Sequence, residues 1–105
     1  MRYYPAPIRD RKIRFALIGC GRIAKNHFAA LRTHGERCEL VDVCDINAAA
    51  LSAAVAETGA KGHSNLADLL AATNADIVIL TTPSGLHPEQ AIAIAATGRH
   101  VMTEK

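Results

Sequence analysis

Short apolar segments alternate with segments of helical periodicity along nearly the whole sequence. The apolar segments have the length and aliphatic content of strands that are buried on both faces of a sheet. Strands separated by helices in this way run parallel, and the helices pack on both faces. With 105 residues the chain has room for one such domain. The sequence therefore predicts an α/β fold with an open, doubly wound parallel sheet, whose ligands bind beyond the carboxyl ends of the strands.

Local signals place the individual elements. The expected strands cover residues 13–18, 40–44, 61–64 and 76–81, and a last one begins at 100–102. The expected helices lie between them and are marked by Ile23, Leu51, Leu66 and Pro88. Glycines are expected to end three of these helices, at Gly35, Gly59 and Gly98. Asn65 and Asp68 form a capping-box-like pair at the start of the third helix. Residues 13–105 are thus the predicted domain, and residues 1–12 an arginine-rich arm that faces solvent or another subunit.

A glycine motif lies between the first strand and the first helix, in the stretch LIGCGRIAKNH. Gly19, Gly21 and Ala24 have the spacing of the turn that holds a dinucleotide in Rossmann-type folds. Gly19 allows a tight turn, Gly21 lets the backbone approach a pyrophosphate, and Ala24 lets the helix pack closely on the strand. The amides of Arg22 and Ile23 are expected to face the phosphates at the positive end of the helix. A purely structural glycine turn is the alternative.

An acidic residue, Asp45, follows the second strand about 20 residues after the glycine turn. A carboxylate at this position accepts hydrogen bonds from both hydroxyls of an adenosine ribose and repels a 2′-phosphate. No arginine follows to receive such a phosphate, because the next residues are Ile46 and Asn47. The sequence therefore favours NAD over NADP. In the alternative interpretation, Asp45 only caps the second helix.

Two further stretches follow later strands. TTPSGLHPEQ, from Thr81, is expected at the crevice where the strand order reverses, with Pro83 in a fixed turn. Taken alone, His87 is more typical of a residue that starts a helix than of a catalytic residue. GRHVMTEK places Glu104 and Lys105 just past the fifth strand, on the same edge as the glycine turn. A solvated strand exit is the alternative for this charged pair.

Composition excludes several other classes of protein. A net charge of +2 is too small to indicate nucleic acid as the main partner, and no apolar run is long enough for a membrane span. Leu-Ile-Gly-Cys resembles a lipoprotein attachment box, but Arg14 interrupts the apolar run that a signal peptide needs. The three cysteines and five histidines lack metal spacing, so no metal site is expected. Unpaired cysteines of this kind favour a reducing cytoplasm.

Taken together, the glycine turn, Asp45, TPSGLHPEQA and GRHVMTEK resemble the glucose–fructose oxidoreductase and inositol dehydrogenase family, from about Lys12 to Lys105. Within that family, ALIGCGRIAKNHFAAL, LVDVCDI and TTPSGLHPEQAI are similar to bacterial dehydrogenases of UDP-N-acetyl-glucosaminuronic acid. The resemblance implies an NAD-dependent enzyme that oxidises the C-3 hydroxyl of this nucleotide sugar in lipopolysaccharide O-antigen synthesis. Another sugar or inositol as substrate, or a non-catalytic module that senses NAD(H), are the alternatives. A methyltransferase is disfavoured by the proline turn and the terminal Glu-Lys pair.

The resemblance also implies roles for individual residues. The cofactor-binding set would be Gly19, Gly21, Arg22, Ile23, Asp45, Ile46, Thr81, Thr82, Pro83, Ser84, His87, Glu104 and Lys105. Thr82, Pro83, Ser84 and His87 would line the nicotinamide side, where many relatives have asparagine in place of Ser84. Glu104 would contact the nicotinamide ribose, and Lys105 would be catalytic, touching the hydroxyl that is oxidised and stabilising its developing negative charge.

Family members continue from this lysine into a second α/β domain. That domain supplies the sugar pocket and the surface through which a homo-oligomer, a dimer or tetramer, assembles. The chain is therefore expected to be the cofactor-binding part of a longer protein, able to bind a dinucleotide weakly but unable to oxidise a sugar alone.

Overall fold

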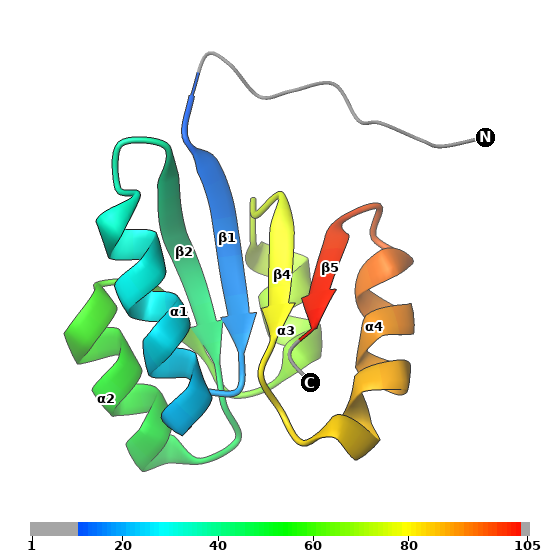
Figure 1. Cartoon of the computed structure of the whole chain (residues 1–105). Coiled ribbons are helices and arrows are strands. Elements are labelled where there is room, and N and C mark those ends of the chain that lie inside the picture. Colours follow the sequence, from blue (N-terminus) through cyan, green and yellow to red (C-terminus); the bar gives the residue numbers. More distant parts are fainter. Residues whose placement is uncertain (1–10, 104–105) are drawn as a thin grey trace.

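The computed structural model describes residues 11–103, which form a parallel sheet of five strands in the order β3-β2-β1-β4-β5. The strands are β1 (Ile13–Ile18), β2 (Cys38–Cys44), β3 (Lys61–His63), β4 (Ile77–Leu80) and β5 (His100–Thr103). The helices are α1 (Arg22–Thr33), α2 (Ala48–Thr58), α3 (Leu66–Ala72) and α4 (His87–Ala95), and a 3₁₀ turn, η1 (Ser84–Leu86), precedes α4. Figure 1 shows β1, β2, β4 and β5 side by side with their arrowheads at the same edge. The predicted doubly wound fold is confirmed, with the strand order reversing between β1 and β4.

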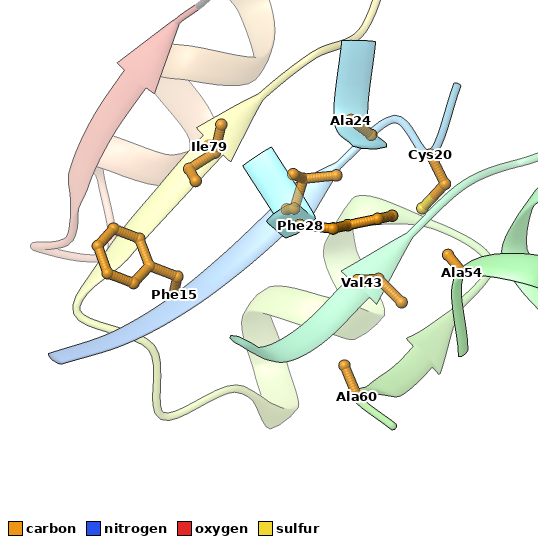
Figure 2. Packing of buried hydrophobic residues seen from close by; sticks show 9 residues of the cluster. Phe15, Cys20, Ala24, Phe28, Val43, Ala54, Ala60 and Ile79 are labelled. Atoms are coloured by element: carbon orange, nitrogen blue, oxygen red, sulfur yellow. The ribbon is translucent and has the colours of Figure 1, made fainter. Parts of the chain in front are cut away.

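Two apolar cores lie on opposite faces of the sheet. On one face, α1 and α2 cover a cluster that includes Phe15, Leu17 and Val43 from the strands. Figure 2 shows Phe28 of α1 in the middle of this cluster. On the other face, α3 and α4 cover a second cluster built on the residues that alternate with the first along the strands. Apart from Phe15 and Phe28, the buried residues of the two clusters are aliphatic residues and cysteines.

Local capping explains where the helices begin and end. Asn47 accepts from the amide of Ala50 at 2.9 Å and starts α2, which Gly59 ends in the left-handed conformation with φ 74°. The predicted capping pair of α3 is also confirmed, because the Asn65 side chain accepts from the Asp68 amide at 2.8 Å and donates to its carboxylate. These short-range signals can be read from the sequence because each involves neighbouring residues.

Two of the expected helix ends differ from the structure. The C-cap of α1 is His34, with φ −102°, and Gly35 does not take a positive φ. The amide of Gly35 instead bonds to the carbonyl of Arg32 at 3.2 Å, in a turn that needs no left-handed residue. The fourth helix ends at Ala95, and Gly98, with φ 82°, closes the turn after it.

A buried polar cluster joins the middle of β2 to its neighbours. The register of β2 shifts opposite residues 15–16, and this leaves Val41 as an extra residue, a β-bulge, before Asp42. Asp42 is only 4% exposed and accepts hydrogen bonds from His63 Nε2 at 2.8 Å and Thr73 Oγ1 at 2.6 Å. A buried carboxylate needs such donors, so this cluster fixes the short edge strand β3 against β2.

An ion pair fastens the start of the sheet at the edge opposite the carboxyl ends. Arg11 donates two hydrogen bonds of 2.8 Å to the carboxylate of Asp76, which also accepts from the Arg14 amide at 2.9 Å. Residues 1–10 of the predicted arm lie outside the described residues. Within residues 11–103, no helix is long and apolar enough to cross a membrane.

Candidate functional site

A pocket of about 410 Å³ opens at the carboxyl ends of β1, β2 and β4. It therefore lies where the strand order reverses, the expected position for a ligand in a doubly wound sheet. The pocket is lined by Ile18, Gly19, Gly21, Cys44, Asp45, Ile46, Asn65, Leu66, Thr81, Thr82, Pro83, Leu86 and Gln90. Of the predicted cofactor residues, the lining includes Gly19, Gly21, Asp45, Ile46, Thr81, Thr82 and Pro83.

The two glycines of the turn, Gly19 and Gly21, differ in how much room their surroundings leave for a side chain. Gly19 has φ +96°, and a Cβ atom added there would lie 2.8 Å from the backbone nitrogen of Thr82. At Gly21 an added Cβ would meet nothing within 4 Å. Gly19 is therefore required by the fold itself, whereas the space beside Gly21 is open on the side where a ligand would approach.

The first turn of α1 presents free backbone donors. Its N-cap, Gly21, has no side chain to accept from the following amides, and the first turn contains no acidic residue. Arg22 and Ile23 begin the helix and are exposed. An uncapped helix start with open space in front of it fits a phosphate group, which the positive end of the helix dipole attracts.

Asp45 joins the glycine turn to the start of α2. One carboxylate oxygen accepts from the amide of Cys20 and the other from the amide of Asn47, each at 2.8 Å. The cap of α2 is Asn47, so the alternative in which Asp45 merely caps that helix is wrong. A carboxylate oxygen can accept more than one hydrogen bond, so this half-buried group keeps acceptor capacity toward the pocket. The next residue, Ile46, is 91% exposed and gives the rim an apolar surface.

The loop between β4 and α4 is tied to the glycine turn. The hydroxyl of Thr81 donates to the carbonyls of Ile18 and Gly19. Thr82 Oγ1 donates to Gln90 Oε1, and the imidazole of His87 bonds to the Thr82 carbonyl at 2.6 Å. Ser84 begins η1.

The two cysteines next to the pocket are not nucleophiles. Burial, reinforced by the charge of Asp45, raises the pKa of Cys20 to about 12 and that of Cys44 to about 11. Both thiols are therefore protonated at neutral pH and pack as small apolar groups. Among residues 11–103, no group of His, Cys, Asp or Glu could hold a metal ion.

The site residues predicted from the sequence and the residues that line the pocket in the structure do not fully coincide. Glu104 and Lys105 lie outside the described residues. Conversely, Leu66, Leu86 and Gln90 line the pocket although the sequence did not single them out. Gln90 lies three residues after His87, one helical turn along α4, and that spacing is the signal that could have found it.

The fold and this pocket define a dinucleotide-binding domain of the Rossmann type. The residues fit such a ligand, because Gly21, the N-cap of an uncapped helix with open space beside it, lines the same pocket as Asp45, which follows the neighbouring strand. The model of the oxidoreductase family with an NAD-binding Rossmann fold, Gfo/Idh/MocA, matches residues 13–105. The chain belongs to this family.

Individual relatives agree with this assignment. The WlbA dehydrogenase of Chromobacterium violaceum, solved with NADH and UDP-GlcNAcA, is 68% identical with a TM-score of 0.95, and the match covers 100% of this chain and 30% of that one. The WlbA dehydrogenase of Bordetella pertussis, in complex with the same two molecules, is 62% identical with a TM-score of 0.92, over 94% of this chain and 30% of that one.

A curated relative outside this pair is 4-carboxy-2-hydroxymuconate-6-semialdehyde dehydrogenase of Sphingobium sp. It is 37% identical, over 88% of this chain and 29% of its own length. The chain thus spans about 30% of the length of these relatives.

Proposed function

We propose that this chain binds NAD(H) in the pocket at the carboxyl ends of β1, β2 and β4. The amides of Gly21, Arg22 and Ile23 hold the pyrophosphate, and Asp45 holds the adenosine ribose. The observation that supports this assignment is the 2.8 Å hydrogen bond from the Cys20 amide to the carboxylate of Asp45, because it joins the proposed ribose acceptor to the turn that contains the proposed phosphate donors. Ile46 and Pro83 supply apolar walls on either side of the pocket.

In the whole protein, the proposed activity is oxidation of the C-3 hydroxyl of UDP-N-acetyl-glucosaminuronic acid, in lipopolysaccharide O-antigen synthesis. The support is the 68% identity to a WlbA dehydrogenase that was crystallised with NADH and this sugar nucleotide. Bound NAD supplies the hydride acceptor for such an oxidation. The proposed catalytic residue is Lys105, two positions after β5 ends, with Glu104 at the nicotinamide ribose. As C-3 gives up its hydride and a base takes the proton of its hydroxyl, the Lys105 ammonium stabilises the negative charge that develops on the hydroxyl oxygen.

The cellular setting follows from the same proposal. An enzyme that uses NAD and a sugar nucleotide works in the cytoplasm, and the three cysteines at positions 20, 38 and 44 are free thiols, as that compartment requires. Assembly into a dimer or tetramer stays a prediction, because it depends on the second domain that family members have and this chain does not cover.

Calorimetric titration of the chain with NADH and NADPH tests the cofactor site. We expect NADH to bind more tightly, because a unit charge about 4 Å from Asp45 is repelled by roughly 1–4 kcal/mol. Asp45→Asn removes that repulsion and should bring the two affinities to within a few-fold of each other. The control is Glu36→Gln, an exposed acid in the turn between α1 and β2 that is not among the residues lining the pocket. Equal binding of both cofactors by the unmodified chain would refute the role of Asp45.

The catalytic proposal is tested in the whole protein. NADH formation should depend on UDP-N-acetyl-glucosaminuronic acid and should not occur with UDP-N-acetyl-glucosamine, which lacks the carboxylate. Lys105→Ala should remove most of the turnover while NADH still binds. Turnover that survives this substitution would contradict a catalytic role for Lys105, and binding of NAD(H) with no turnover of any sugar would favour a sensing module.

A further inference from the structure

Thr82 and its neighbour Thr81 are the residues at which the β4–α4 loop meets the glycine turn. The Cβ that Gly19 lacks would lie 2.8 Å from Thr82 N and 2.9 Å from its Cγ2. Thr82 also lines the pocket, and the wall of the pocket continues from it into Pro83 and Leu86. The position of Thr82 therefore contributes to the distance between the loop and the turn proposed to bind the pyrophosphate.

Two side chains of α4 hold Thr82 from the other side. Thr82 Oγ1 donates to Gln90 Oε1 at 2.5 Å, and His87 Nε2 lies 2.6 Å from the Thr82 carbonyl oxygen. A carbonyl oxygen can only accept, so Nε2 of His87 carries the hydrogen and donates it. His87 and Gln90 are separated by one helical turn, so both form their hydrogen bonds with Thr82 from the same face of α4.

His87 differs from Gln90 in its relation to the pocket. Gln90 is among the residues that line the pocket, and His87 is not. The Nε2 hydrogen of His87 is already committed to a backbone carbonyl within its own loop. The resemblance to the family places His87 along the nicotinamide side, but the geometry gives it a partner in the protein instead.

We infer that His87 is a positioning residue: it sets the β4–α4 loop against the glycine turn by holding the carbonyl of Thr82, and it does not contact the cofactor. This inference rests on the proposed function of the pocket as an NAD(H) site. Without the hydrogen bond from His87, the Thr82 carbonyl loses its partner and the loop is no longer fixed from the side of α4. The pocket then has to be ordered when the ligand binds, which weakens binding.

The test compares His87→Ala with His87→Gln, because the terminal N–H of glutamine can replace that of Nε2. NADH affinity is measured by calorimetry on the 105-residue chain. We expect about five- to tenfold weaker binding for His87→Ala, the usual effect of one lost hydrogen bond, and recovery to within about twofold for His87→Gln. The matched control is His34→Ala at the exposed end of α1, which should bind NADH like the unmodified chain.

A second measurement separates this inference from the cofactor assignment. The Leu86 amide donates to the Pro83 carbonyl at 2.9 Å, so its hydrogen exchange without cofactor reports on the order of the loop. Exchange at Leu86 should be faster in His87→Ala and normal in His87→Gln, whether or not NADH binds. Equal loss of NADH affinity in both variants would overturn the inference in favour of a direct contact, and unchanged affinity and exchange in His87→Ala would overturn it altogether. Failure of the unmodified chain to bind NADH would refute the proposed function, and the exchange result would still decide the role of His87.

Discussion

Replacing the two glycines of the turn by alanine should separate folding from binding. Gly19 has a positive φ and its missing Cβ would lie 2.8–2.9 Å from backbone atoms of Thr81 and Thr82. Gly21 has φ −85°, which suits alanine, and open space around it. We expect Gly19→Ala to destabilise the domain strongly and Gly21→Ala to leave its stability nearly unchanged.

The magnitude for Gly19→Ala has two parts. A left-handed conformation costs an L-residue about 1–2 kcal/mol, and forcing a methyl group against packed backbone typically costs about 1–3 kcal/mol. The sum, about 2–5 kcal/mol, is a large part of the roughly 5–15 kcal/mol by which such domains are stable. Gly59→Ala isolates the first part, because Gly59 has φ +74° with nothing within 4 Å of its added Cβ.

Urea unfolding followed by circular dichroism measures all three variants. The free energy of unfolding should fall most for Gly19→Ala, by about 1–2 kcal/mol for Gly59→Ala, and by less than about 0.5 kcal/mol for Gly21→Ala. NADH titration should then show Gly21→Ala binding at least about tenfold more weakly, because its methyl group occupies the approach of the pyrophosphate. If Gly19→Ala is no less stable than Gly59→Ala, the close approach to Thr82 is refuted; if Gly21→Ala binds NADH normally, the phosphate assignment is refuted.

Three further outcomes follow from the same geometry. In hydrogen exchange without cofactor, the Cys20 amide should be protected, because it is hydrogen-bonded to Asp45. The amides of residues 21–23 should exchange fast, and they should become protected only when NADH is added. Iodoacetamide at neutral pH should label Cys38 before Cys20 and Cys44, because burial raises the pKa of Cys20 to about 12 and that of Cys44 to about 11. Mass spectrometry of the labelled chain gives the order of labelling, and the opposite order would show that Cys20 and Cys44 are accessible thiolates. The hydrogen bonds that Arg11 donates to Asp76 lower the pKa of this carboxyl group. Asp76 therefore stabilises the fold fully at pH values above its ordinary pKa, and this stabilisation is lost as the pH falls through the lowered pKa. Acid unfolding should therefore be less steep in Asp76→Asn, and an unchanged acid transition would contradict the ion pair.

Much of the fold could be predicted because its signals are local. The strand and helix alternation, the Asn65 cap and the left-handed Gly59 depend only on residues close in sequence. The sequence predicts the end of α1 wrongly at Gly35 for the same reason, because a glycine just after a helical segment is typical of a left-handed cap. In the structure His34 caps the helix with its amide bonded to the carbonyl of Ala30 at 3.1 Å, and nothing forces a positive φ.

The site could be predicted only in outline, because its internal contacts cross the sheet. The glycine spacing and Asp45 were visible in sequence, since each follows its own strand. The hydrogen bond from Cys20 to Asp45 depends on β1 pairing with β2, and the contact of Gly19 with Thr82 depends on β1 pairing with β4. A contact between residues more than 60 positions apart in sequence has no local signal, so only the strand order reveals it.

These contacts across the sheet bear on how the pocket binds its ligand. The turn at Gly19 is joined to β2 through the Asp45 carboxylate and to the β4–α4 loop through the Thr81 hydroxyl. The three segments that follow β1, β2 and β4 at the pocket are thus fixed to one another by bonds within the chain, before any cofactor is added. Binding therefore spends little free energy on ordering the backbone, so affinity should depend on the groups that meet the ligand directly. In the proposed site Asp45 has two roles, because its carboxylate accepts hydrogen bonds within the protein and would also accept from the ribose. Asp45→Asn removes the charge but keeps the side chain's shape and one of its two acceptor oxygens, so it disturbs the turn less than a truncation would.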